Sequence, residues 1–234
     1  MKNTGKIALL LVAIALLLVL DTGLRNPQVP AVATVTIKEG MTIVEINKLL
    51  QESEILSGEE IPRSLEGYIF PDTYEFYINS PLSLVLQKIE DNFNKKARPH
   101  IPEGEEAKIL TIASLVEREV IGEETRRLVA GVIYKRLENS YPLQIDASIC
   151  YVKPPPCHPI LSNDLKIDSP YNTYMYKGLP PTPIANPGLE AIIASASPKK
   201  SDYWFYITDP ITQKAIFAKN IDDHQSNIYK YLKN

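Results

Sequence analysis

The sequence has few of the residues that build metal, thiol or redox sites. It contains two cysteines, Cys150 and Cys157, and three histidines, His100, His158 and His224. No CxxC pair, zinc-finger spacing or HExxH motif occurs. We therefore expect neither a metal centre nor a cofactor.

Other common signatures are missing as well. There is no GxSxG nucleophile motif and no Walker loop for nucleotide phosphates. The formal charge is −3, so the chain lacks the basic excess typical of nucleic-acid binding, and we expect no nucleic-acid partner. Hydrophobic residues make up 44% and charged residues 23%, a composition that favours a globular protein over a disordered one.

The longest apolar run lies at the N-terminus, from Ile7 to Leu20, and follows Lys2 and Lys6. As a helix it would span about 21 Å, less than the ~30 Å hydrocarbon core of a bilayer. It is either the apolar region of a cleaved signal peptide or a short anchor extended by its neutral flanks. We favour the anchor, because the small-residue site at 31–33 lies too far downstream for usual cleavage. The lysines then predict a single-pass protein of the cell membrane with an extracytoplasmic domain.

Export would permit a disulfide between Cys150 and Cys157. The two cysteines flank the segment YVKPPP, so a bridge would close a tight loop stiffened by proline. Two free thiols are the alternative. In either case we expect a structural role and no chemistry.

Hydrophobic periodicity predicts helices over about 43–50, 81–97, 102–120 and 123–139, and a shorter one at 189–198. Strands are predicted at 35–37 and 141–152, and a hairpin is predicted to join 203–208 to 214–219. Helices and strands do not alternate regularly, so we expect an α+β fold. The predicted organisation is a cytoplasmic tip and anchor at 1–24, a linker at 25–34, a small strand–turn–helix module at 35–58 and the main domain at 59–234.

A long loop, residues 169–188, is dense in Pro, Gly, Asn and Tyr. Loops of this length inside a compact domain are frequently functional. Tyr faces stack on sugar rings, and Asn and Thr bond their hydroxyls, which is the chemistry of a carbohydrate site. The same composition is also normal for a well-packed Ω-loop.

The segment IASLVEREV carries Glu117 and Glu119 at the two edges of an apolar helical stripe. A carboxyl at such an edge can be half desolvated, which raises its pKa toward that of a general acid. A surface glutamate on an amphipathic helix is the alternative. Periodicity does not choose between the two residues.

Several motifs, read in order, resemble the family of endolytic murein transglycosylases, the YceG-like proteins. They are LEGYIFPDTYEF, ILTIASLVEREV, VAGVIYKRL, PLQIDASICY and SPYNTYMYKGLPPTPIANPGLEA, and the resemblance covers about Val35 to the C-terminus. It implies a membrane anchor, a LysM-like module at 35–58 and an extracytoplasmic catalytic domain. The implied enzyme cleaves the MurNAc–GlcNAc bond of peptidoglycan glycan strands, leaves a 1,6-anhydro-MurNAc end and terminates nascent strands, in association with peptidoglycan synthases.

The resemblance also assigns site residues. The first glutamate of the ASxVExE pattern, here Glu117, would be the catalytic residue. The residues implied to line the saccharide groove are Gln144, Asp146, Tyr171, Asn172, Thr173, Gly178, Leu179 and Pro180. The chain departs from the family pattern in having one LysM-like copy where two are usual. That departure favours the alternative of a catalytically inactive murein-binding scaffold.

Overall fold

The structure, a computed structural model, describes residues 31–212 and 214–232. The predicted anchor at 1–24 and most of the predicted linker at 25–34 lie outside these residues. Within the described part of the chain, no helix is long and apolar enough to cross a membrane. From Ala33 onward the described residues form one compact unit.

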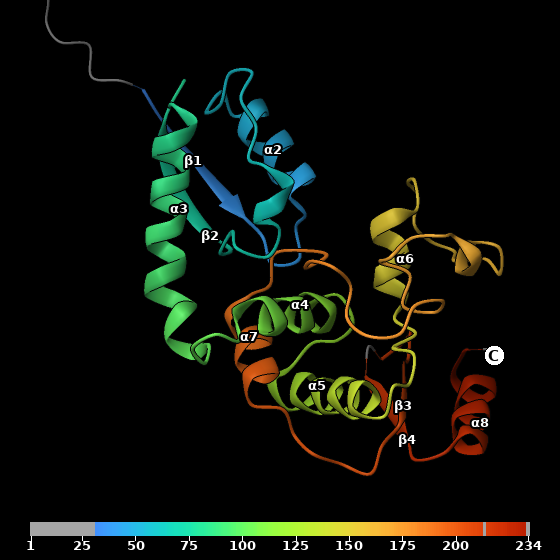
Figure 1. Ribbon diagram of the computed structural model, residues 1–234. Coiled ribbons are helices and arrows are strands. Elements are labelled where there is room, and N and C mark those ends of the chain that lie inside the picture. The colour runs from blue at the N-terminus through green and yellow to red at the C-terminus, as the bar shows by residue number, and fades with distance from the viewer. Residues whose placement is uncertain (1–30, 213, 233–234) are drawn as a thin grey trace, which may run out of the picture. The chain divides into compact units, whose positions relative to one another are not determined.

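The first part of this unit is a two-stranded sheet with two helices packed against it. Strand β1 (Val32–Ile37) pairs with β2 (Asp72–Tyr77), and the apolar residues of α2 (Ile43–Glu52) and α3 (Leu82–Lys96) join theirs in one hydrophobic cluster (Figure 1). This cluster continues past residue 58 as far as Ile89. The small module predicted at 35–58 therefore buries its apolar face against β2 and α3.

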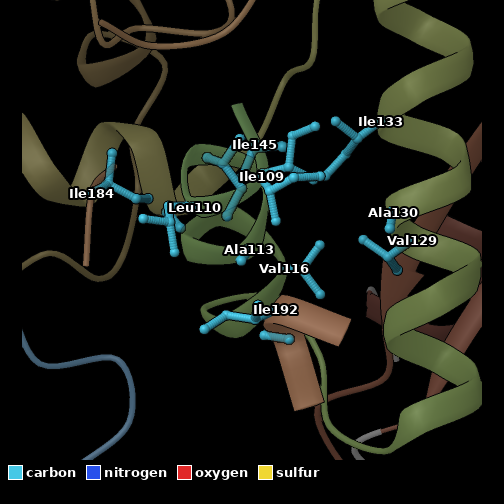
Figure 2. Packing of buried hydrophobic residues seen from close by; sticks show 14 of the residues in the cluster. Ile109, Leu110, Ala113, Val116, Val129, Ala130, Ile133, Ile145, Ile184 and Ile192 are labelled. Carbon is cyan, nitrogen blue, oxygen red and sulfur yellow. The ribbon is translucent and has the colours of Figure 1, made fainter. Parts of the chain in front are cut away.

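Three helices form the second cluster. They are α4 (Glu106–Glu117), α5 (Glu123–Glu138) and α7 (Leu189–Ala196), which contact one another pairwise. Figure 2 shows their buried aliphatic side chains gathered between the helices, among them Ile109, Ala113, Val116, Val129, Ile133 and Ile192. Almost every residue of α4 from Ile109 to Val116 is buried, so this helix is the centre of the domain.

The strand predicted at 141–152 is wrong, because Asp146–Val152 forms a helix, α6. A short apolar run cannot be assigned to helix or strand from periodicity alone. Ile145 is extended, and the helix begins with Asp146, whose negative charge is favourable at a helix N-terminus.

The C-terminal part is an antiparallel hairpin and a helix. Strands β3 (Phe205–Thr208) and β4 (Ala215–Ala218) pair, and α8 (Ile221–Leu232) packs on both (Figure 1). Single 3₁₀ turns occur at Arg63–Leu65, Arg98–His100 and Asp164–Lys166. The mixture of helices with two small sheets agrees with the predicted α+β class.

The long loop at 169–188 contains no helix or strand, and its Asn186 links the two clusters. Asn186 is fully buried. Its Oδ1 accepts hydrogen bonds from the N–H groups of Gly67 and Ile69 at 2.9 and 3.0 Å. Its Nδ2 donates to the Met41 carbonyl and to Glu66 Oε1, both at 2.9 Å. The backbone of Asn186 adds bonds to Gly40 and Met41, both at 2.9 Å, so this one residue anchors the loop to the first part of the unit through its side chain and its backbone.

Candidate active site

A cavity of about 610 Å³ lies beside strand β3. Its lining comes from five separate segments, which meet only in the folded chain. They are Glu119 just after α4, Arg136 of α5, the segment holding Gln144 and Asp146, Tyr174 of the long loop, and the β3–α8 region. The cavity therefore joins polar and ionisable groups from widely separated parts of the sequence.

Glu119 is the acidic residue with the most unusual surroundings in this cavity. Its pKa is raised from 4.5 to about 7, mainly by burial and also by the negative charge of Asp146. The N–H of Ala147, the hydroxyl of Tyr206 and the charge of Arg136 act in the opposite direction. A carboxyl with this pKa holds its proton over much of the neutral range and can serve as a general acid.

The backbone places Glu119 outside the helix. Helix α4 ends at Glu117, and the N–H of Glu119 bonds the carbonyl of Val116 at 3.2 Å in a tight turn. The hydroxyl of Thr208 on β3 reaches the carbonyl of Glu119 at 3.4 Å. The side chain therefore points toward the hairpin and the cavity, a direction that a helical projection does not give.

Two of the residues implied by the resemblance lie in the cavity wall. Gln144 is exposed and has a left-handed backbone, with φ of 53°. Its N–H donates to the Thr173 carbonyl at 3.0 Å, which fixes the turn before α6. Asp146 accepts a 2.5 Å hydrogen bond from the Tyr174 hydroxyl. Both residues present polar groups to the same space as Glu119.

Asn172 and Thr173 do not line the cavity. Both are buried, and their polar groups are used within the protein. Asn172 Nδ2 donates to the carbonyls of Leu165 and Ile167, at 3.0 and 2.8 Å. Thr173 Oγ1 accepts from the Ile145 N–H at 2.9 Å. These bonds to backbone groups hold the loop in shape, and the implied groove role of the two residues stays a prediction.

The remaining implied groove residues also lie outside the cavity lining. The Tyr171 hydroxyl shares a 2.7 Å hydrogen bond with Thr182, and its ring packs 4.9 Å from that of Tyr151. Leu179 packs on the hydrophobic core, Pro180 is buried, and Gly178 has a φ of 94°. The resemblance implied that these four residues line the saccharide groove, but none of them lines this cavity: Tyr171, Gly178, Leu179 and Pro180.

Glu117, the catalytic residue implied by the resemblance, is held in an ion pair away from the cavity. Its side chain is 6% exposed. Oε1 accepts from Arg126 Nη2 at 2.9 Å, and Oε2 accepts from the Gly188 N–H at 2.9 Å. Burial raises its pKa, against the effects of Gly188 and Arg126. The two oxygens thus bond groups of α5 and of the segment just before α7, and Glu117 does not line the cavity. A catalytic role for Glu117 stays a prediction from the resemblance.

Sequence reasoning assigned no site role to the other ionisable side chains of the cavity, which are Arg136, Tyr141, Tyr174, Tyr206 and His224. Tyr174 directly follows the YNT segment and was within the loop singled out for sugar binding. Arg136 is buried and donates to the carbonyls of Trp204, at 2.9 Å, and Leu143. It thereby ties β3 to the turn before α6, and both carry cavity residues.

The structure joins Cys150 and Cys157 in a disulfide, just past the cavity-lining start of α6. Lys153, between them, donates to the carbonyls of Cys157 and Pro159 at 3.0 and 2.9 Å. Neither cysteine lines the cavity, so the bridge closes a loop and adds no reactive group to the site.

The sequence profile of the YceG-like family matches residues 13–230 of the chain. A protein named endolytic murein transglycosylase from Bacillus subtilis (strain 168) is 34% identical over 183 residues, covering 75% of this chain and 50% of that protein. One of the same name from Streptococcus pneumoniae (serotype 2, strain D39) is 30% identical, covering 90% of this chain and 46% of that protein. The chain thus spans about half the length of the curated relatives it matches.

A solved structure is similar as well. The crystal structure of a YceG-like protein from Listeria monocytogenes aligns with a TM-score of 0.72 and 27% sequence identity. The alignment covers 83% of this chain and 75% of that chain. The α+β arrangement described above is therefore one that a related protein adopts.

Proposed function

This chain belongs to the YceG-like family, and from that premise we propose that it is an endolytic lytic transglycosylase of peptidoglycan. It would cleave the bond between MurNAc and GlcNAc within glycan strands and leave a 1,6-anhydro-MurNAc end. The observation that carries the proposal is the cavity holding Glu119, a carboxyl whose pKa is raised to about 7 beside groups that can bond a sugar.

In the proposed reaction Glu119 acts twice. As an acid it donates its proton to the bridging oxygen, and the bond from MurNAc C1 to that oxygen breaks. The carboxylate then takes the proton of the C6 hydroxyl, whose oxygen attacks C1 and closes the anhydro ring. The attacking hydroxyl belongs to the same sugar as C1, so the ring closure is intramolecular and avoids the entropy cost of positioning a second reactant. No water is required as a nucleophile.

The neighbours of Glu119 support this double role. Asp146 raises the pKa of Glu119 and so favours the protonated state before the reaction, whereas Ala147 N–H and Tyr206 stabilise the carboxylate afterwards. Asp146 and Tyr174, bonded to each other, are placed to bind hydroxyl and N-acetyl groups and to stabilise the positive charge that develops on the ring.

The experiment compares two isosteric variants on purified glycan strands. Glu119→Gln should abolish release of anhydro-muropeptides while thermal unfolding stays close to that of the wild type. Glu117→Gln is the matched control, two residues away, and should retain the chemistry while losing part of the stability supplied by Arg126. Undiminished anhydro product from Glu119→Gln would contradict the proposal. So would a folded Glu117→Gln that loses the product while Glu119→Gln keeps it.

A second candidate is a hydrolase, because Asp146 places another carboxyl in the same cavity and ordinary glycosidases use two. Mass spectrometry separates the two reactions, since anhydro ends are lighter by one water than reducing ends. A catalytically inactive scaffold would bind murein and release neither product.

We also propose the cell-membrane location with an extracytoplasmic active site. Its support is the apolar run at 7–20 with lysines before it and, for an oxidising compartment, the Cys150–Cys157 bridge. The full chain should fractionate with membranes, whereas a chain starting at residue 31 should not. Equal distribution of the two forms would contradict an anchor at this place.

The LysM-like character of residues 35–58, a role in terminating nascent strands and an association with peptidoglycan synthases are proposed on the resemblance alone. The strand and capped helix at 32–52 are compatible with such a module. Cross-linking the full chain in cells and identifying the partners tests the synthase association.

A further inference from the structure

Helix α8 presents an apolar row to the same cavity that contains Glu119. Ile221, His224, Ile228 and Leu232 are spaced three, four and four residues apart, which places them on one face of a helix, and all four line the cavity. No described residue of α8 is buried, and Ile221 and Leu232 are 48% and 45% exposed. The aliphatic side chains of this row therefore line the cavity and remain partly exposed to solvent.

Strand β3 connects this row to the acid. The Tyr206 hydroxyl donates a hydrogen bond to the Glu119 carboxyl, and the Thr208 hydroxyl donates to the Glu119 carbonyl. One face of β3 therefore contacts Glu119. Phe205, on the opposite face, stacks on the His224 ring with centroids 4.9 Å apart. All four residues of β3 line the cavity, so the cavity passes around the strand from the acid to α8.

The opposite edge of β3 is paired. Its register joins Phe205 to Ala218 and Thr208 to Ala215 of β4, and the two-stranded sheet has no third strand among the described residues. Glu119 and the apolar row of α8 line one cavity, so a long ligand bound at Glu119 can also contact α8.

The chemistry of the two ends of this cavity differs. The end at Glu119 offers carboxyl, hydroxyl and guanidinium groups, whereas the end at α8 offers three aliphatic side chains and one imidazole. Burial and the nearby charge of Arg136 lower the pKa of His224, which favours the neutral imidazole. The α8 end therefore offers mainly apolar surface to a ligand.

We propose that the apolar row of α8 is an extended subsite for the glycan strand, resting on the proposed function of the site. It would contact the methyl groups of the N-acetyl and lactyl substituents, and the carbon faces of the rings, beyond the bond that is cut. Covering partly exposed Ile and Leu side chains with these groups removes apolar surface from water and favours binding. The subsite adds affinity for strands and takes no part in the chemistry.

The test uses peptide-free glycan strands and three single variants of the full chain. Ile228→Ser and Leu232→Ser should each raise KM about fivefold, corresponding to about 1 kcal/mol, and leave kcat unchanged. Tyr229→Ser is the matched control, because Tyr229 is on the same helix, is 71% exposed and does not line the cavity. It should behave as the wild type.

The same three changes in a Glu119→Gln background separate binding from cleavage. Affinity for uncleaved strands should fall by the same factor in the two row variants and not in the Tyr229 control. Unchanged affinity in folded row variants would overturn the subsite and leave the proposed reaction standing. Conversely, the wild type could release no anhydro product while the row variants still bind strands more weakly. That result would contradict the proposed reaction and support the subsite. Leu232 lies at the end of the helix and is exposed, so Leu232→Ser should leave α8 folded. Its affinity for strands therefore tests the subsite even if Ile228→Ser unfolds the helix.

Discussion

At the scale of single residues, Glu117 and Glu119 differ in what their carboxyls meet. Glu117 is held by Arg126 and the Gly188 N–H, so its charge is matched by donors on two neighbouring helices. Burial raises the pKa of both carboxyls against their donors, but Glu119 lines the cavity with Asp146, whereas Glu117 does not. The proposed general acid must reach a ligand, so the carboxyl in the cavity wall is the candidate.

The dependence of activity on pH should change when the negative charge of Asp146 is removed. This charge raises the pKa of Glu119, so Asp146→Asn should lower that pKa, and the loss of activity with rising pH should begin at a lower pH. The profile of kcat/KM against pH measures the shift. Asp168→Asn is the matched control, because Asp168 accepts a 2.5 Å bond from Tyr176 as Asp146 does from Tyr174, yet lies outside the cavity lining. An unmoved profile in Asp146→Asn would contradict the coupling.

Stability should also depend on pH through Glu66. Glu66 is 2% exposed, and burial raises its pKa from 4.5 to about 7. The folded state then binds more protons than the unfolded chain between these values, so stability is fully present below pH 4.5 and is lost as pH rises through about 7. The loss is up to about 3 kcal/mol. Glu119 contributes in the same direction.

Glu66→Gln removes this titration. Urea unfolding measured from about pH 5 to about pH 8 should show a flatter dependence in the variant than in the wild type. An identical slope in both proteins would contradict a raised pKa at Glu66.

The polar residues of the site were only partly predictable. Gln144 and Asp146, implied by the resemblance, do line the cavity, whereas Asn172 and Thr173 are buried. Sequence could not separate the two groups, because a loop without a periodic pattern does not reveal which side chains turn inward. Periodicity left Glu117 and Glu119 as equal candidates, because the helix was predicted to continue to residue 120, whereas it ends at Glu117 and only Glu119 of the two lines the cavity.

At the scale of elements, α5 lies against the backbone that follows α7. A Cβ on Gly131 would lie 2.0 Å from the Lys199 carbonyl oxygen, and the Lys199 N–H bonds the Arg127 carbonyl at 2.9 Å. Gly131→Ala should therefore destabilise the protein by about 1–3 kcal/mol, the usual effect of overpacking. Urea unfolding is the measurement.

Thr125→Ala on the same helix is the control for the gain in helix propensity. It should be neutral or slightly stabilising, because alanine is the better helix former. A Gly131→Ala variant as stable as this control would mean that α5 and the segment after α7 are not in close contact.

Helix prediction succeeded where an apolar stripe was long. The predicted helices at 81–97, 123–139 and 189–198 correspond to α3, α5 and α7, and the hairpin corresponds to β3 and β4. It failed at α6, a helix of seven residues, because so short a run contains too little periodicity.

At the scale of the whole molecule, Asn186 joins the two hydrophobic clusters. Asn186→Ala would leave the Gly67 and Ile69 N–H groups without their side-chain acceptor, so we expect a loss of at least about 2 kcal/mol. Asn139→Ala, at an exposed asparagine with one bond to its own helix, should cost far less.

The unfolding of the wild type should be one cooperative step, because the described residues from Ala33 onward form one unit. Fluorescence of Trp204, the single tryptophan, and far-UV circular dichroism should give the same transition. Two separated transitions would show that the first cluster unfolds independently.

The α+β class could be predicted from the irregular order of helical and strand patterns. The extent of the first cluster could not, because it depends on β1 pairing with β2 across about 35 residues of intervening chain. The boundary between the module at 35–58 and the domain at 59–234 remains a prediction.

The surroundings of Glu119 have a consequence for when the protein can become active. The acid is at position 119, the start of α6 at 146 and Tyr206 on the hairpin, so the groups that set its pKa come from three distant stretches. A nascent chain emerging from the ribosome up to residue 200 already has α4 and α6 but lacks the strand that covers the carboxyl. If Glu119 is the acid, as proposed, its Tyr206 hydrogen bond and part of its burial form only once the C-terminal hairpin has docked.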